Sequence, residues 1–216
     1  MSWRDHFFYR KESLHTTWKF RLLVVLLPLV FLIVTRGFWT TKIGESLVCE
    51  KNVTPSDALL LENFDAEYLI FQNARELRKA GVASRAFVPV RTEVDSMDPN
   101  VISMRIAQIM AEVARVEVEI IPIQEIEPIS LNAANQIRDF LKAEHIDSVT
   151  VVSPDFRSRR SMLVYDRVFG AAGISTGCSP VFGRRTTSNW TDSWHGLQEV
   201  GLQFLKLQFY RFYVIR

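Results

Sequence analysis

The sequence predicts an α/β fold: a three-layer sandwich built on a mostly parallel sheet and preceded by a single N-terminal transmembrane helix. The first observation behind this prediction is an uncharged, apolar run from Leu22 to Thr35. The second is that short aliphatic runs alternate with amphipathic ones from residue 57 onward, which is typical of parallel strands joined by crossover helices. The third is length, because the roughly 170 residues after the apolar run are enough to form one hydrophobic core but too few for two domains of ordinary size.

The apolar run predicts a retained membrane anchor at residues 18–39. Arg21 and Arg36 bound the run, and Trp18 and Trp39 lie just outside it, as expected at the two headgroup layers of a bilayer. A helix over this range rises about 33 Å, enough for a slightly tilted crossing. A buried helix would show polar residues at helical spacing, and a cleaved signal peptide would need a small-residue site downstream. The sequence has neither, so an uncleaved anchor is predicted.

The charges on either side of the anchor predict its orientation. Basic residues outnumber acidic ones before the apolar run. The basic residues there are Arg4, Arg10, Lys11, Lys19 and Arg21, and the acidic ones are Asp5 and Glu12. Arg36 and Lys42 follow it before Glu45. The positive-inside rule therefore predicts a cytoplasmic tail at residues 1–17 and an external remainder, with a linker at 40–56 and the α/β domain at 57–216.

The alternation predicts five strands and five helices in order. Residues 58–61 are aliphatic throughout and predict the first strand, and 68–80 place Leu69, Ala74 and Leu77 near one helical face before Gly81 ends the helix. The later strands are expected at 85–90, 117–122, 148–152 and 174–180, and the later helices at 100–114, 131–144, 159–171 and 192–212. Right-handed crossovers then give a Rossmann-like sandwich.

The closing helix is rich in aromatic residues, which we expect to cover the sheet. Its core face is predicted from helical spacing as Leu197, Gly201, Phe204, Leu205 and Gln208, in preference to a membrane-binding face. Whether residues 212–216 lie near the bilayer is left open.

Composition excludes some classes of protein and leaves others open. A net charge of +2 without a basic-aromatic array does not indicate nucleic-acid binding. The sequence holds no G-x-S-x-G elbow, Walker loop or G-x-G-x-x-G, and no histidine-cysteine spacing typical of a metal site, so no metal is predicted and the cofactor stays unknown. Cys49 and Cys178 both follow the anchor, and a disulfide and two buried thiols remain equal alternatives.

Polar residues follow the predicted strands, at the edge of the sheet where such folds bind ligands. Glu62 and Glu127 are the candidate catalytic acids, bases or ligands. The candidate ligand-binding residues after the first, third and fourth strands are Asn63, Ser130, Ser153, Arg157 and Arg160. Carboxylates from two strands converging with arginines from a third indicate anion recognition or acid-base chemistry. Other readings stay open: Ser130 as a helix N-cap, the arginines as partners of Glu62 and Glu127, and the two carboxylates as weak ligands for a divalent cation.

Two motifs in this region resemble those of the ElyC/SanA/YdcF family of mostly envelope-associated bacterial proteins. Glu127–Asn132 matches an E-x-x-S-x-N stretch that opens a helix, and Val152–Arg160 occupies the place of a strand ending in V-T-S followed by H-x-x-R. Trp194 and the stretch from Leu205 to Tyr210 are similar to the family's closing helix. The resemblance implies that Asn132 belongs with the ligand-binding residues.

The chain also departs from the family pattern. Residues 61–65 replace a glycine-rich loop, Arg157 replaces the family histidine, and Asn135 and Gln136 replace an acidic-amide pair. The expected function is that of a single-pass inner-membrane protein with a periplasmic domain, acting in cell-envelope biogenesis on a phosphorylated or lipid-linked glycan intermediate. Its expected partners are the lipid bilayer, such a glycan or envelope-assembly proteins. The alternative is a non-catalytic adaptor or regulator of envelope polysaccharide assembly, and whether the protein is an enzyme is left open.

Overall fold

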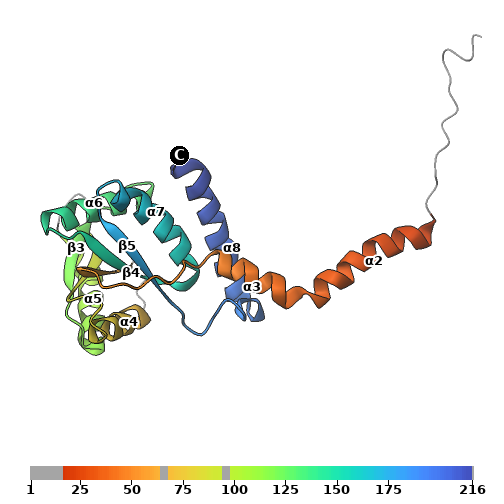
Figure 1. Ribbon diagram of the computed structural model, residues 1–216, viewed down its shortest axis with the longest axis horizontal. Coiled ribbons are helices and arrows are strands. Elements are labelled where there is room, and N and C mark those ends of the chain that lie inside the picture. The colour runs from red at the N-terminus through yellow and green to blue at the C-terminus, as the bar shows by residue number, and fades with distance from the viewer. Residues whose placement is uncertain (1–16, 64–67, 94–97, 216) are drawn as a thin grey trace, which may run out of the picture. The chain divides into compact units, whose positions relative to one another are not determined.

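The computed structural model describes residues 17–63, 68–93 and 98–215 (Figure 1). The chain divides into two compact units, residues 1–39 and residues 40–216, which we describe separately. The predicted cytoplasmic tail at residues 1–17 lies, apart from Thr17, outside the described residues.

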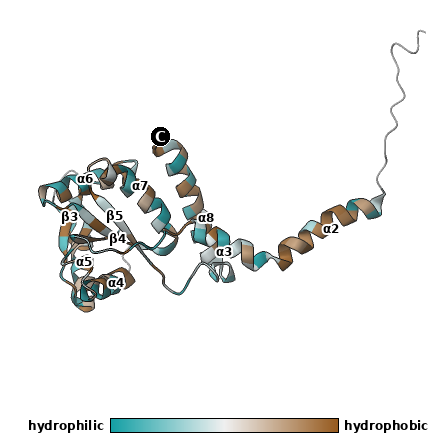
Figure 2. Cartoon of the chain, in the orientation of Figure 1, coloured by the Kyte–Doolittle hydropathy of each residue, from teal (hydrophilic) through white to brown (hydrophobic). Residues whose placement is uncertain are grey.

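The first unit contains helix α2 (Trp18–Val34), which buries none of its residues and is apolar along most of its length (Figure 2). Its N-terminus is capped by the Thr17 hydroxyl, which accepts a hydrogen bond from the Phe20 amide. The helix ends at Thr35, whose hydroxyl donates to the Phe31 carbonyl and accepts from the Trp39 indole. Helix α3 (Arg36–Ser46) follows directly.

This break changes the prediction for residues 18–39. Among the described residues no single helix is long and apolar enough to cross a membrane, and α2 and α3 meet that test only as a pair bent by 64°. The single continuous span predicted from the sequence is therefore not found. Hydropathy and length did not reveal the break at Thr35, where the backbone leaves helical geometry with φ −91° and ψ 9°. Part of the predicted linker, residues 40–46, is also helical and forms the second half of α3.

The second unit is built on a five-stranded, entirely parallel sheet in the order β3-β2-β1-β4-β5. The strands are β1 (Ala58–Leu61), β2 (Arg85–Arg91), β3 (Glu119–Ile123), β4 (Ser148–Pro154) and β5 (Ser175–Val181). In the register, Leu60 of the central strand pairs with Phe87 of β2 and Val151 of β4. The predicted α/β class and the parallel sheet are confirmed.

Helices cover both faces of the sheet, as the alternation of strand side chains requires. Leu60 faces a core shared with α6 (Ile129–Ala143) and α7 (Ser158–Gly170). Leu59 and Leu61 face the opposite core, shared with α4 (Tyr68–Lys79) and α5 (Val101–Ala114). The chain closes with η2 (Trp190–Asp192), α8 (Trp194–Phe209) and the π-helical turn η3 (Tyr210–Val214). The arrangement fits a Rossmann-like sandwich.

A segment before β1 is fastened to the edge strand β5. Asn52 exchanges two backbone hydrogen bonds with Cys178, and a disulfide joins Cys178 to Cys49. The crossing is close, because a Cβ at Gly177 would lie 2.7 Å from the Asn52 carbonyl oxygen, and glycine is needed there. Of the two alternatives for the cysteines, the structure has the disulfide, which the sequence could not decide because it does not show the Cα separation of 6.5 Å.

The expectation for the closing helix is wrong in its choice of face. Leu197, Phe204 and Leu205, predicted to be in the core, are 41%, 43% and 67% exposed. The helix instead buries Gly196, Val200, Leu207 and, one residue past its end, Tyr210. Helical spacing alone does not distinguish two apolar faces, and Gly196 selects this one because its side approaches the Trp190 carbonyl more closely than any side chain would permit.

Candidate functional site

A polar cleft of about 490 Å³ in the second unit lies beyond the carboxyl ends of the strands. Its floor comes from the end of β1 and the start of α7, one wall from the start of α6, and another from the last turn of α8. Among the described residues the buried charged side chains are Glu62, Arg157 and Arg160, and all three line this cleft. Because buried charge is costly, its concentration at one place marks the cleft as a candidate site.

The two arginines are presented by the turn after β4. The strand ends at Pro154, the 3₁₀ turn η1 (Asp155–Arg157) follows, and α7 begins at Ser158. Its first turn is held from outside, since the Arg159 amide donates to the Leu47 carbonyl and the Ser158 hydroxyl accepts from the Cys49 amide. Arg157 and Arg160, three residues apart, therefore both reach the cleft, and each is only 8% exposed.

The guanidinium group of Arg160 contacts two side chains from other elements, Ser130 and Tyr210. Its Nη1 donates to the Ser130 hydroxyl of α6 at 2.8 Å, and its guanidinium lies 5.4 Å from the centre of the Tyr210 ring. Its Nε is buried without a hydrogen-bond partner among the described residues. Desolvation lowers the pKa of Arg160, the neighbouring Glu62 opposes this, and the charge of Arg157 adds to it.

Glu62 is the carboxylate buried beside these arginines, with 3% of its surface exposed. It accepts hydrogen bonds from the hydroxyls of Ser153 and Tyr165. Tyr165 of α7 is fully buried, and its pKa is raised by desolvation first and then by the charge of Glu62. The carboxylate is thus held in place by two donors from β4 and α7 while it partly balances the two guanidinium groups.

Ser130 is not the N-cap that capping preference predicted. Helix α6 begins at Ile129, after Pro128, so that Ser130 lies inside the first turn. Its hydroxyl accepts from Arg160, and its amide donates to the Tyr210 hydroxyl at 3.1 Å. The serine therefore joins α6, α7 and the end of α8 around the cleft, a role that only the tertiary contacts reveal.

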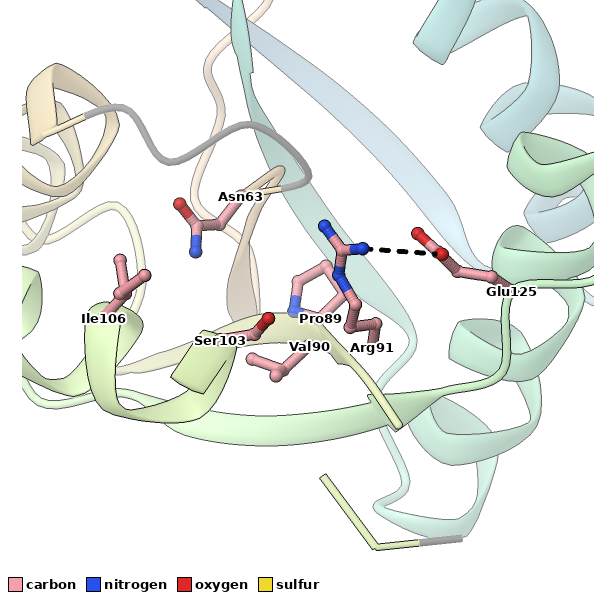
Figure 3. A pocket seen from close by; sticks show the side chains of 7 residues that line it. All are labelled: Asn63, Pro89, Val90, Arg91, Ser103, Ile106 and Glu125. Atoms are coloured by element: carbon pink, nitrogen blue, oxygen red, sulfur yellow. Dashed lines mark ion pairs between the residues drawn. The ribbon is translucent and has the colours of Figure 1, made fainter. Parts of the chain in front are cut away.

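The rim of the cleft is exposed and carries both signs of charge. Glu127 and Lys206 line it on opposite elements, and Arg91 of β2 forms an ion pair of 3.7 Å with Glu125. Arg91 and Glu125 also line a smaller pocket of about 120 Å³. Figure 3 shows Asn63 in that smaller pocket, with Arg91 extending toward Glu125.

The structure brings most of the predicted site residues together. Glu62, Glu127, Ser130, Arg157 and Arg160 share the cleft. Asn63 lines the smaller pocket instead, and Ser153 is fully buried beneath Glu62. Asn132 is not among the residues lining the cleft: its amide donates to the carbonyls of Ile126 and Glu127, which fixes the loop that presents Glu127.

Sequence reasoning missed several residues that line the cleft or support it from below. Tyr165, Lys206 and Tyr210 lie on helices that were assigned only to packing, and no motif signals that their polar ends meet at the strand edge. Arg91, the last residue of β2, and Glu125, two residues past β3, were by contrast indicated by their place at the ends of parallel strands, although neither was chosen as a site residue. Within the described part of the chain, no three histidine, cysteine, aspartate or glutamate residues are grouped so as to hold a metal ion.

No protein-family model matches this chain, and no curated protein matches it. The resemblance to the ElyC/SanA/YdcF family therefore rests on the motifs quoted above.

Proposed function

We propose that the cleft binds a phosphorylated group, in a membrane-anchored periplasmic protein of the bacterial cell envelope that handles a phosphorylated or lipid-linked glycan intermediate. The observation that supports this best is the set of buried charges: two guanidinium groups and one carboxylate among the described residues, all in one cleft. The excess of positive charge there favours an anion over a neutral or cationic ligand.

The surroundings of the arginines favour a phosphate group over a simple ion. Arg160 has a buried Nε available as a donor, and its stack on Tyr210 and its bond to Ser130 fix the plane of the guanidinium. A fixed guanidinium plane suits the two-point binding of phosphate oxygens. Exposed Lys206 adds a third cationic group at the open side.

The proposed location rests on the sequence at the N-terminus. The apolar helix α2 buries nothing among the described residues, and the charges around it follow the positive-inside pattern. The motif resemblance supports a bacterial envelope setting. A reporter fused after Arg216 is expected to be active outside the cytosol, and activity of a cytosolic reporter instead would contradict the location.

Titration of the full chain in detergent with inorganic pyrophosphate and a sugar 1-phosphate tests the binding proposal. Arg157→Ala and Arg160→Ala should each weaken binding by about 1.5 to 3 kcal/mol, the range for hydrogen bonds to charged groups. Arg160→Lys should restore only part of the loss, since a point charge does not reproduce a fork of donors. Arg85→Ala, at the opposite end of the sheet, is the matched control and should bind as the wild type does. Lack of binding by the wild type at millimolar ligand would overturn the proposal.

A binding role without turnover is the second candidate, and the state of Glu62 favours it. Its carboxylate already accepts from Ser153 and Tyr165, as a group that positions the arginines would. Exposed Glu127 is then the remaining candidate acid or base of the pair. If the protein is an enzyme, Glu127→Gln should abolish product formation while keeping ligand binding; if it is an adaptor, the wild type should bind the same ligands and release them unchanged.

A further inference from the structure

The outward face of α8 and the turn after it is apolar, although the opposite face is already used to cover the domain. Buried Gly196, Val200 and Leu207 mark the inner face. The outward residues are 41–77% exposed, and they are Trp194, Leu197, Leu202, Phe204, Leu205, Phe209, Phe212 and Tyr213. A helix packed on one side of a soluble domain normally shows polar residues on the other.

The outward residues form a continuous stripe on α8. Trp194 and Leu205 are eleven residues apart, which places them almost on one line along a helix of 3.6 residues per turn. Leu197 and Phe204 flank this line on one side, and Phe209 flanks it on the other. Exposed side chains of this size gathered along one helix indicate a surface that is covered in the working protein.

The charges beside the stripe match an anionic lipid surface. Lys206 and Arg211 are exposed, and neither takes part in an ion pair within the described residues. Glu199, the acidic residue of α8, is bound to Arg185 at 2.7 Å. Aromatic side chains with basic neighbours are the composition of helices that lie in the headgroup layer of a membrane.

The path of the chain places this helix next to the segment that leads from the apolar N-terminus. The Thr40 carbonyl accepts a hydrogen bond of 2.9 Å from the Trp190 indole, four residues before α8. Leu47 is fully buried in a cluster with Val200 and Leu207 of α8. The residues that directly follow the proposed anchor are therefore packed on the inner side of α8.

Helix α5 also exposes apolar residues, and the comparison favours α8. Val101, Ile102, Ile109 and Val113 are aliphatic, without the aromatic residues typical of a headgroup layer. The charges on that surface are balanced, since Arg105 lies 4.0 Å from Glu112. The α5 surface lacks the excess of basic residues seen at α8, and it provides a matched control.

We propose that the outward face of α8 lies in the headgroup layer of an anionic lipid bilayer. The proposal rests on the anchor in the proposed function and adds a second contact with the membrane. Lys206 and Phe209 of the same helix line the cleft, so docking would open that side of the cleft toward the membrane surface. The phosphorylated group bound by Arg157 and Arg160 would then be the headgroup of a membrane-resident lipid.

Photo-crosslinking of the full chain in vesicles of phosphatidylethanolamine and phosphatidylglycerol tests the docking. Benzoylphenylalanine is placed at Leu205 in one variant and at Ile109 in the control, and lipid adducts are measured by mass spectrometry. We expect several-fold more lipid adduct at position 205 than at 109, and less of it when phosphatidylcholine replaces both lipids. Equal adducts at the two positions, or a crosslink from position 205 to a second copy of the chain, would overturn the proposal.

Two further measurements separate this proposal from the proposed function. Resistance to alkaline carbonate extraction reports on the anchor in both variants, whatever α8 does. Pyrophosphate titration in detergent reports on the cleft without a bilayer. A chain that resists extraction and binds pyrophosphate, yet gives no lipid adduct at position 205, refutes the docking of α8 alone.

Discussion

The two ends of the sheet carry different clusters of charge. At the amino end, Arg85 of β2 lies partly exposed between the carboxylates of Glu119 and Glu144. At the carboxyl end, Arg157 and Arg160 are buried in the same cleft as the carboxylate of Glu62. Arg85 binds Glu119 through two nitrogens, at 2.8 and 2.6 Å, and Glu144 at 2.8 Å. These hydrogen bonds, with Glu119 foremost, raise the pKa of Arg85, while desolvation lowers that of Arg160. In the first cluster the two carboxylates more than offset the charge of Arg85 without a ligand. The second keeps an excess of positive charge in a cleft, which a bound anion would offset.

The largest expected effect is on the free energy of unfolding when one carboxylate is removed from each cluster in turn. Glu62→Gln removes the buried carboxylate of the cleft that offsets the charge of Arg160 and should lower the free energy of unfolding by about 3 to 5 kcal/mol. Glu144→Gln, in the exposed cluster, should cost far less because water screens that pair. Urea unfolding of the full chain in detergent measures both. Equal losses would mean that the two clusters are alike. Added pyrophosphate should restore more stability to Glu62→Gln than to the wild type.

The disulfide should matter mainly to the buried cluster, because it fastens the segment that holds the start of α7. Replacing Cys49 and Cys178 by serine removes a long-range crosslink and should cost about 2 to 4 kcal/mol. Hydrogen exchange should then speed up at the first turn of α7, where Arg159 donates to Leu47, more than in β2 beside Arg85. Uniform loss of protection across the sheet would contradict this coupling.

A smaller effect tests the support of Glu62. Tyr165→Phe removes a buried donor from the carboxylate and should destabilise the protein by about 1 to 3 kcal/mol, with weaker pyrophosphate binding as the arginines lose their fixed partner. Tyr68→Phe is the control, since the Tyr68 hydroxyl makes no hydrogen bond within the described residues. Unfolding and titration of both variants measure the difference. Unchanged binding in Tyr165→Phe would limit Tyr165 to a packing role.

The smallest expected effect is on the acid stability of the protein, through Asp57 at the amino end of the sheet. The Ser148 hydroxyl and the amides of Asp147 and Ser148 hold the pKa of Asp57 below its ordinary value of 3.8. A carboxyl group with a lowered pKa stabilises the fold above the unfolded value, and this contribution is lost as the pH falls through the folded value. Asp57→Asn should therefore lose a little stability at neutral pH and show a flatter decline below pH 3.8. A decline as steep as that of the wild type would assign the acid sensitivity elsewhere, first to Glu119.

The strand boundaries were predictable because most of the strands, such as β1 and β2, are short aliphatic or β-branched runs whose ends are marked by polar residues. All five strands begin and end within two residues of the expected positions. The place of the cleft was predictable for a related reason, since the carboxyl ends of parallel strands meet at one edge. Glu62 and Arg157 were therefore found by their position after β1 and β4, without knowledge of their contacts.

Other features depend on contacts between distant residues and were not predictable. Tyr165 and Tyr210 look like core aromatics in the sequence, and only the packing of α7 and η3 brings their hydroxyls to Glu62 and Ser130. Ser130 has the identity of an N-cap, yet Arg160 takes its hydroxyl after α6 has begun one residue earlier. The residue type determines which hydrogen bonds a side chain can make, and its neighbours in the folded protein determine which of them it does make.

The sequence by itself determined the alternation of strands and helices, the parallel sheet and the edge at which polar groups gather, because these follow from local periodicity and chain connectivity. Only the tertiary structure decided which of two apolar faces α8 buries, that Cys49 bonds to Cys178, and that the helix from Trp18 breaks at Thr35. Each of these depends on a close approach, such as that of Gly196 to Trp190, or on a local backbone bend. Neither leaves a periodic trace in the order of residues.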